Sequence, residues 1–296
     1  MPDEEITAAA AGTWTLGDRT VNRMGFGSMR ITANPDRDVA IRVLHRAVEL
    51  GVNHIDTAAF YVSPGGTLGI EGGPRRTAND LIRRALAPYP DGLVIVTKVG
   101  PGEDENGAWT EAVTADQLRR QVEQNLRTLG RDRLDVVNLR LMGRSTPLEP
   151  RFEALAAMRD EGLIGHLGLS NARLSDVEAV AQIAPVVCVQ NSYSVDHRRA
   201  DDALLQACGE QGIAFVPFFA IAGTGREAGA ATAHSDAIES VAQAHGVTPY
   251  QVRLAWTLHQ GPHVLAIPGT GDPTHLEQNI AAGTIRLSAD ELAQLG

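Results

Sequence analysis

The chain reads VIVTKV at residues 94–99, TADQLRRQVEQNLRTLG at residues 114–130 and LDVVNL at residues 134–139. The first and third segments are short and rich in β-branched apolar residues, which is typical of buried strands. The middle segment opens with Thr114-Ala-Asp-Gln, a signal for the start of a helix, and closes on Gly130, a residue type that often ends one. A strand, a helix and a second strand in this order predict two parallel strands joined by a crossover helix.

The same alternation extends over the chain and predicts an α/β fold, a (β/α)8 TIM barrel with an N-terminal β-hairpin. Strands are expected near residues 24–26, 54–56, 94–99, 134–139, 165–169, 186–190, 213–218 and 264–267. Helices are expected near residues 36–50, 76–87, 114–130, 150–161, 174–184, 199–212, 235–260 with a break, and 272–283. The hairpin is expected at residues 14–21, around a Gly17-Asp18 turn. An open doubly wound sheet is the alternative, but no G-x-G-x-x-G turn follows an early strand, which favours the closed barrel.

Length and composition indicate a single domain over residues 1–296, with residues 1–12 expected to be flexible. Hydrophobic residues make up 43% of the chain, which is enough apolar material for a full core. The sequence has no apolar run of membrane-spanning length and no signal peptide at its start, so we expect a cytoplasmic protein without a membrane partner. The net charge of −10 disfavours nucleic acid and favours a small molecule as partner. Cys188 and Cys208 lack metal-ligand spacing, so no metal is expected, and the oligomeric state, monomer or homo-oligomer, stays open.

Four polar residues are expected to meet at the carboxyl ends of neighbouring strands, where the chemistry of such barrels takes place. Asp56 ends the second strand, Tyr61 follows it, Lys98 lies near the end of the third and Arg140 ends the fourth. Lys98 is the only lysine among 26 basic residues, which indicates a position that rejects arginine. A lysine held by Asp56 would lower the pKa of Tyr61 from about 10, so that Tyr61 could protonate a carbonyl oxygen. These residues alone leave open a purely structural ion pair.

Motifs along nearly the whole chain carry a family resemblance. They are GVNHIDTAAFY at residues 51–61, VTK at 96–98, GHLGLSN at 165–171, VQNSY at 189–193, and IPGT at 267–270 followed by HLEQN at 275–279. In order and spacing they resemble the aldo-keto reductases. The resemblance implies a barrel that binds NADPH across its carboxyl face and reduces a small carbonyl compound, with Asp56, Tyr61 and Lys98 as catalytic residues.

One position departs from the family pattern. The family usually places a histidine at the end of the fourth strand, where this chain reads LDVVNLR and ends on Arg140. A guanidinium keeps its charge near neutral pH, so we expect Arg140 to orient the substrate oxygen and to depress the pKa of Tyr61. This segment is similar to the bacterial pyridoxal reductase branch, as are FVPFF at 215–219 and HRRADD at 197–202. Pyridoxal is therefore an expected substrate; shared ancestry without a shared substrate is the alternative.

Further positions match those that hold the nicotinamide cofactor in the family. The carboxamide is expected against Ser170, Asn171 and Gln190, and the ring against Phe218. A helix that starts near Asp272 is expected to offer free amides to a phosphate. The remaining expected cofactor-binding residues are Gly27, Ser28, Gly269, Thr270, His275, Gln278 and Asn279. Many relatives have basic residues at the positions of Gly269 and His275, so NADH stays an alternative to NADPH.

The substrate pocket is expected to be shaped by Met29, Arg30, Trp109 and the loop of residues 62–76. This loop contains five glycines and is either a mobile lid or a tolerated surface insertion. The leading expectation is an NADPH-dependent reductase of a small carbonyl compound. A reductase of a ketone or sugar intermediate, favoured by this loop and by AIA at 220–222, is one alternative. A cofactor-binding regulatory subunit that senses redox state is another.

Overall fold

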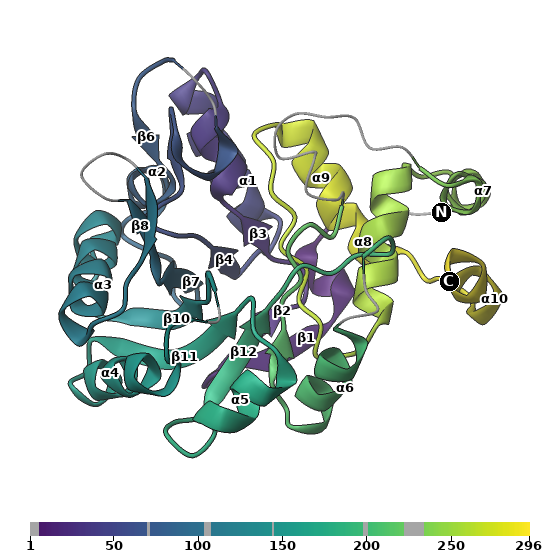
Figure 1. Ribbon diagram of the computed structural model, residues 1–296. Coiled ribbons are helices and arrows are strands. Elements are labelled where there is room, and N and C mark those ends of the chain that lie inside the picture. Colours follow the sequence, from purple (N-terminus) through teal and green to yellow (C-terminus); the bar gives the residue numbers. More distant parts are fainter. Residues whose placement is uncertain (1–5, 70–71, 104–107, 144, 198–200, 222–233) are drawn as a thin grey trace.

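A parallel β-barrel surrounded by helices forms the centre of the computed structural model, which describes residues 6–69, 72–103, 108–143, 145–197, 201–221 and 234–296 (Figure 1). Its strands are parallel neighbours in the order β13 (Ala214–Phe215), β12 (Val186–Gln190), β11 (Ile164–Ser170), β10 (Leu134–Arg140), β7 (Val94–Val99), β4 (His54–Asp56) and β3 (Phe26–Gly27). The two edges are joined by the segment around Leu265, because Val264 bridges Phe215 and Ala266 bridges Met24. The barrel therefore has no open edge.

The helices follow the strands along the chain and cover the outside of the barrel (Figure 1). They are α1 (Arg37–Glu49), α2 (Ala78–Leu86), α3 (Ala115–Leu129), α4 (Glu149–Asp160), α5 (Leu174–Val180), α6 (Asp202–Glu210), α7 (Asp236–His245), α8 (Pro249–His259), α9 (Pro273–Ala281) and α10 (Ala289–Leu295). Short 3₁₀ helices lie at Ala8–Ala11, Met29–Ala33, Gly66–Leu68 and Ala282–Thr284. None of the described helices is both long and apolar enough to cross a membrane.

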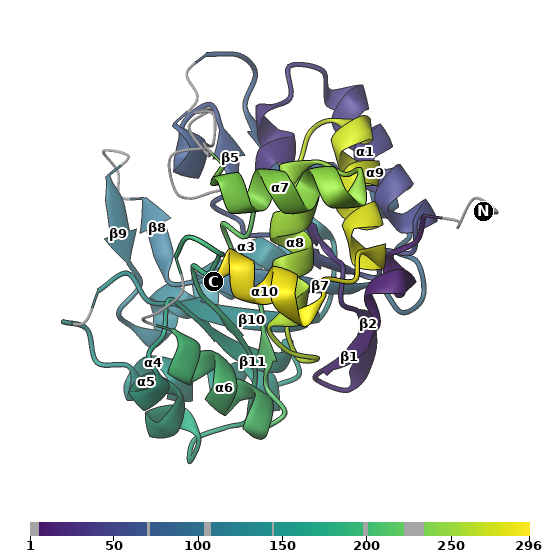
Figure 2. The ribbon, with the colours of Figure 1, turned by 90° about the vertical axis from the view of Figure 1, so that its right-hand side faces the viewer.

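Three antiparallel hairpins are added to this frame. The first, β1 (Thr13–Leu16) with β2 (Arg19–Asn22), places Leu16 and Val21 in the apolar cluster inside the barrel, so it covers the amino-terminal end. The others, β5 (Val62–Ser63) with β6 (Arg76–Thr77) and β8 (Pro101–Glu103) with β9 (Trp109–Glu111), belong to the loops that follow β4 and β7. Figure 2 shows β8 and β9 on the opposite side of the barrel from β1 and β2.

Strand β7 shows how the sequence divides its side chains between two layers. Successive side chains of a strand point to opposite faces. Val94 and Val96 lie in the inner apolar cluster, whereas Ile95 and Val99 lie in the outer cluster between strands and helices. Lys98 continues the inner row at the carboxyl end, which is why a lysine can lie inside the barrel.

The predicted fold class and the N-terminal hairpin are confirmed. The break expected within residues 235–260 is confirmed, because Gly246 ends α7 with a left-handed φ of 65° and Thr248 caps α8. The hairpins β5–β6 and β8–β9 were not predicted, since their strands are too short for a periodic pattern.

Several predicted segments, including the loop of residues 62–76, fall partly outside the described residues. Residues 1–5 of the segment expected to be flexible lie outside, but its later part forms the 3₁₀ helix Ala8–Ala11, in which Ala8 and Ala11 are buried. Residues 199–200 of the helix expected at 199–212 also lie outside the described residues, as does Ala222.

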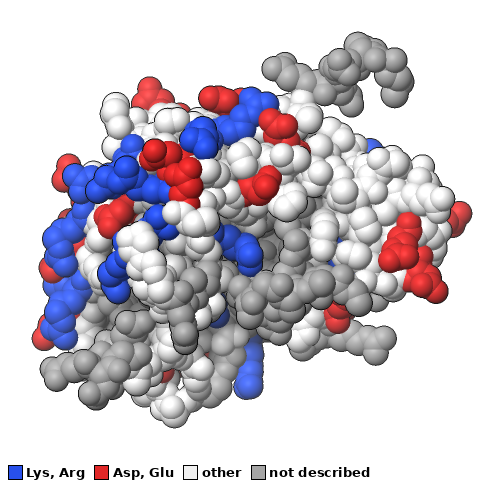
Figure 3. Space-filling view, turned by 90° about the horizontal axis from the view of Figure 1, so that it is seen from above, with Lys and Arg blue, Asp and Glu red and all other residues white. Residues whose placement is uncertain are grey.

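Charges of both signs are mixed on the face shown in Figure 3. Basic and acidic side chains gather there on the left, the side that carries α2 and α3 in Figure 1, and most of the right-hand side is uncharged.

Candidate active site

A buried ion pair lies at the carboxyl end of the barrel. The ammonium of Lys98 donates to both carboxylate oxygens of Asp56, at 2.6 and 2.7 Å, and to the carbonyl of Thr57 at 3.1 Å. The side chain of Lys98 is 1% exposed and that of Asp56 is 5% exposed. Burial lowers the pKa of Lys98, but the charges of Asp56 and Tyr61 outweigh it, so the net pKa lies above the ordinary value. Lys98 is therefore a fixed positive charge.

Tyr61 lies directly over this ion pair. The loop after β4 turns back through a hydrogen bond from the Tyr61 amide to the carbonyl of Ala58, and the Lys98 nitrogen lies 4.9 Å from the centre of the Tyr61 ring. Burial raises the pKa of Tyr61, and the charges of Lys98 and Arg140 oppose that rise without cancelling it. The predicted lowering of this pKa was therefore wrong, because desolvation of the phenolate outweighs the attraction of the cations.

Two amide side chains support the carboxylate from inside the barrel. Gln190, at the end of β12, donates to Asp56 at 2.9 Å and accepts from the amide of Asn138 at 3.4 Å. Cys188 donates to the oxygen of the same Asn138 at 3.0 Å. Burial raises the pKa of the Cys188 thiol to about 12, so it stays protonated and unreactive at neutral pH. Both ends of the Gln190 amide thus contact protein groups, although it was expected to bind a carboxamide.

Arg140 is the last residue of β10 and lines a cleft together with Tyr61 and Lys98. One of its terminal nitrogens donates to the hydroxyl of Ser170 at 3.1 Å. The guanidinium carbon lies 5.1 Å from the centre of the Phe218 ring, a distance typical of a cation–π contact. These two contacts fix the direction of the guanidinium.

A single cleft of about 810 Å³ brings together most of the predicted site residues. The four candidate catalytic residues, Asp56, Tyr61, Lys98 and Arg140, line it. So do the candidate substrate residues Met29, Arg30 and Trp109, and the candidate cofactor residues Gly27, Asn171, Gln190, Phe218, Gly269, Thr270, His275, Gln278 and Asn279. Two predicted residues, Ser28 and Ser170, do not line the cleft; both are fully buried in its wall.

The wall near Gly27 and Gly269 is a close approach of two backbones. A β-carbon on Gly27 would lie 2.6 Å from the carbonyl oxygen of Ile267, and one on Gly269 would lie 2.6 Å from the carbonyl oxygen of Gly27. Larger residues would push the two segments apart. The glycines therefore allow the two backbone segments of this wall to pack against each other.

The start of α9 differs from the expected phosphate site. The carboxylate of Asp272 accepts hydrogen bonds from the amides of Thr274 and His275, at 2.7 and 3.1 Å. Hydrogen bonds from these amides hold the pKa of Asp272 below its ordinary value, although desolvation by burial acts to raise it. The helix start was expected to offer amides to a phosphate, but in the structure Asp272 itself caps two of them.

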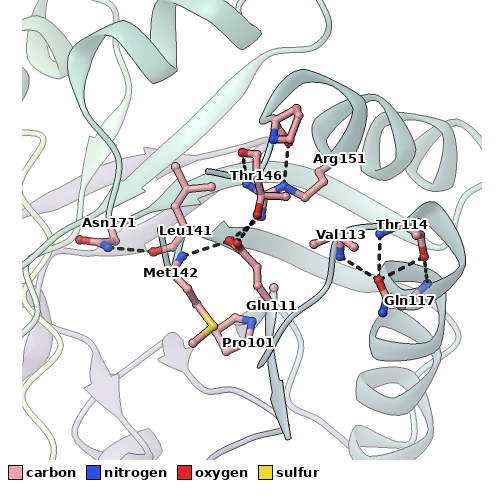
Figure 4. A network of polar contacts seen from close by, with 12 residues as sticks. Pro101, Glu111, Val113, Thr114, Gln117, Leu141, Met142, Thr146, Arg151 and Asn171 are labelled. Atoms are coloured by element: carbon pink, nitrogen blue, oxygen red, sulfur yellow. Dashed lines mark hydrogen bonds and ion pairs between the residues drawn. The ribbon is translucent and has the colours of Figure 1, made fainter. Parts of the chain in front are cut away.

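A clamp on the substrate side holds the β8–β9 hairpin (Figure 4). Glu111 of β9 accepts hydrogen bonds from the guanidinium of Arg151 at 2.6 Å, the hydroxyl of Thr146 at 2.7 Å and the amide of Met142 at 3.2 Å. Arg151 lies on α4 and its side chain is 2% exposed. The same hairpin carries Trp109, whose ring packs edge-on against Phe60 with 5.8 Å between centres. The clamp thus fixes one wall of the cleft.

The sequence did not single out several cleft residues. They are Phe60, Leu141, Met142, Phe219, Thr248 and Tyr250. Phe219 has a left-handed φ of 64°, which is rare for a bulky residue and indicates backbone strain at the cleft. Within the described residues, no group of three or more His, Cys, Asp or Glu side chains has an arrangement that would hold a metal ion.

Comparisons with known proteins agree with this geometry. The model of the aldo/keto reductase family matches residues 23–296. Pyridoxine 4-dehydrogenase of Escherichia coli strain K12 is 44% identical over 299 residues, which cover 97% of this chain and 98% of that protein. An uncharacterized oxidoreductase of Schizosaccharomyces pombe is 36% identical, with 98% of this chain and 90% of that protein covered. An aldo-keto reductase from Klebsiella pneumoniae, solved in complex with NADPH, is 30% identical with a TM-score of 0.79, covering 96% of this chain and 93% of that one. The chain described here belongs to the aldo/keto reductase family of oxidoreductases.

Proposed function

We propose that this protein reduces an aldehyde or ketone to an alcohol with NADPH, that Tyr61 is the proton donor, and that pyridoxal is its substrate. The observation that carries the proposal is the Asp56–Lys98 ion pair beneath Tyr61 at the floor of the cleft. An ion pair with a purely structural role would not need an ionisable phenol above it at the surface of the cleft. A carbonyl reductase needs such a group there, because a general acid must lie next to the bound carbonyl oxygen.

The chemistry assigned to Tyr61 follows from its raised pKa. A phenol with a raised pKa is protonated at neutral pH, so it can donate a hydrogen bond to a carbonyl oxygen. As the carbonyl carbon accepts a hydride, its oxygen gains negative charge and takes the phenolic proton. Lys98 and Arg140 then stabilise the phenolate that remains, until water returns a proton to it.

The residues of the cleft fit a nicotinamide dinucleotide. Phe218 offers an aromatic face on which a flat ring can stack, and the amide side chain of Asn171 lines the same cleft. The backbones at Gly27 and Gly269 both line the cleft and pack against each other there, because neither residue has a side chain. When bound, NADPH supplies the hydride. We choose NADPH over NADH because the Klebsiella pneumoniae relative was solved with NADPH, although Asp272 places a negative charge beside the region expected to hold its phosphate.

Pyridoxal is proposed because the Escherichia coli relative is a pyridoxine 4-dehydrogenase and is similar over nearly its whole length. The test is the oxidation of NADPH by purified protein with pyridoxal, followed by absorbance, with NADH and a panel of aldehydes and cyclic ketones in parallel. We expect turnover of pyridoxal with NADPH. Turnover of other carbonyl compounds alone would retain the chemistry and exclude the substrate, whereas tight cofactor binding without any turnover would contradict the proposal.

A further inference from the structure

Arg140 differs from the two arginines that are buried in the described part of the chain. Arg151 pairs with Glu111, and Arg253 pairs with Asp196. For Arg140, no carboxylate among the described residues lies within ion-pair distance, and its polar side-chain partner is the hydroxyl of Ser170. A guanidinium has five N–H donors, so most donors of Arg140 have no acceptor among the residues that the structure describes.

The position of the Arg140 guanidinium favours a bound ligand as its partner. The side chain is half-buried in the wall of the cleft, where a charge without a counter-ion is costly. Ser170 and the Phe218 ring hold the guanidinium in place, so its remaining donors have a fixed direction. A fixed, permanent cation on a ligand-binding surface favours an anionic ligand group.

We propose that Arg140 selects carbonyl substrates that carry an ionised oxygen on the carbon next to the one bearing the carbonyl group, such as 2-hydroxyaryl aldehydes. This inference rests on the proposed reductase function and adds a substrate class to it. Tyr61 and Arg140 line the same cleft and the charge of Arg140 acts on Tyr61, so a substrate whose carbonyl oxygen accepts a hydrogen bond from Tyr61 brings an adjacent oxygen toward the guanidinium. The planar fork of arginine can contact both oxygens at once, as it does with a carboxylate. Pyridoxal belongs to this class, because a ring hydroxyl flanks its aldehyde.

The test compares 2-hydroxybenzaldehyde with 4-hydroxybenzaldehyde. Both ionise and both donate electrons to the aldehyde, but only the first places its oxygen beside the carbonyl. We expect kcat/KM to favour the 2-hydroxy isomer by about tenfold or more in the wild-type protein, as a charge-assisted hydrogen bond would give. Arg140→Gln should remove most of this preference. In the wild-type protein the preference should also grow as the pH rises through the pKa of the substrate hydroxyl.

Two controls make the result specific. Arg30→Gln removes a second arginine that lines the same cleft. Arg30 follows β3, whereas Arg140 ends β10. The Arg30→Gln variant should leave the ratio of kcat/KM between the two isomers unchanged. Benzaldehyde, which has no hydroxyl, reports the reductase activity by itself. Equal loss of turnover for both isomers in Arg140→Gln would overturn the inference and leave the proposed function intact. A ratio that falls only in Arg30→Gln would also overturn it. No reduction of any of the three aldehydes would overturn the proposed function and the inference with it.

Discussion

Lys98 is the only lysine among 26 basic residues, and its surroundings explain why arginine does not occupy its place. Its nitrogen has three acceptors within 3.1 Å, two from Asp56 and one from Thr57, which match the three donors of an ammonium group. A guanidinium is planar and larger, and it could not present its donors to all three acceptors from the same point. The rarity of lysine in the chain and the position of Lys98 near the end of a strand singled out this residue in the sequence.

At the residue scale, replacing Tyr61 with phenylalanine tests the proton donor. Tyr61→Phe should lower kcat by about 100-fold or more, because the carbonyl oxygen would then gain charge without a proton. The ring and its neighbours stay, so the affinity for NADPH, measured by fluorescence titration, should change little. Turnover at the wild-type rate would show that another group donates the proton.

At the scale of elements, the β8–β9 hairpin depends on one buried contact with α4. In Arg151→Met the carboxylate of Glu111 would lose its counter-ion, although Thr146 and Met142 would still donate hydrogen bonds to it. Arg151→Met should lower the free energy of unfolding by about 3 kcal/mol or more, measured by urea denaturation. The double variant with Glu111→Gln should recover part of the loss, because the unpaired charge is removed as well.

The matched control for the clamp is Arg119→Met. Arg119 pairs with Glu161 at 2.5 Å, but their side chains are 38% and 46% exposed, so water can replace the contact. This variant should unfold at nearly the wild-type urea concentration. A similar loss in Arg119→Met and Arg151→Met would show that the clamp contributes no more than a surface ion pair.

The sequence predicts elements whose patterns are local and misses contacts between distant segments. Strand β7 and helix α3 follow from period and capping within a few residues. The contact between Glu111 and Arg151 joins residues 40 apart in a loop hairpin and a helix, and neither residue has a pattern of its own. The sequence indicates a helix start near Asp272. Whether the amides at this start contact a ligand or the Asp272 side chain depends on the shape of the cleft, which the sequence does not show. The pKa of Tyr61 was predicted in the wrong direction, since burial cannot be read from spacing.

At the scale of the whole molecule, His54 links stability to acid. It lies at the start of β4, fully buried, and a β-carbon on Gly25 would lie 2.2 Å from its ring. Burial lowers the pKa of His54 from 6.5 to about 4. The unfolded chain therefore binds a proton that the folded protein excludes between these values. The contribution of His54 to stability is complete above pH 6.5 and declines as the pH falls toward 4.

His54→Gln tests this linkage, because glutamine is neutral at every pH. Between pH 7 and pH 4.5, about the range over which His54 titrates on unfolding, the wild-type protein should lose more stability than the variant, measured by urea denaturation at each pH. Other titrating groups are shared by both proteins, so they cancel in the comparison. Equal slopes for the wild-type protein and His54→Gln would show that the ring is protonated in the folded barrel as readily as in the unfolded chain, and that its burial does not limit acid stability.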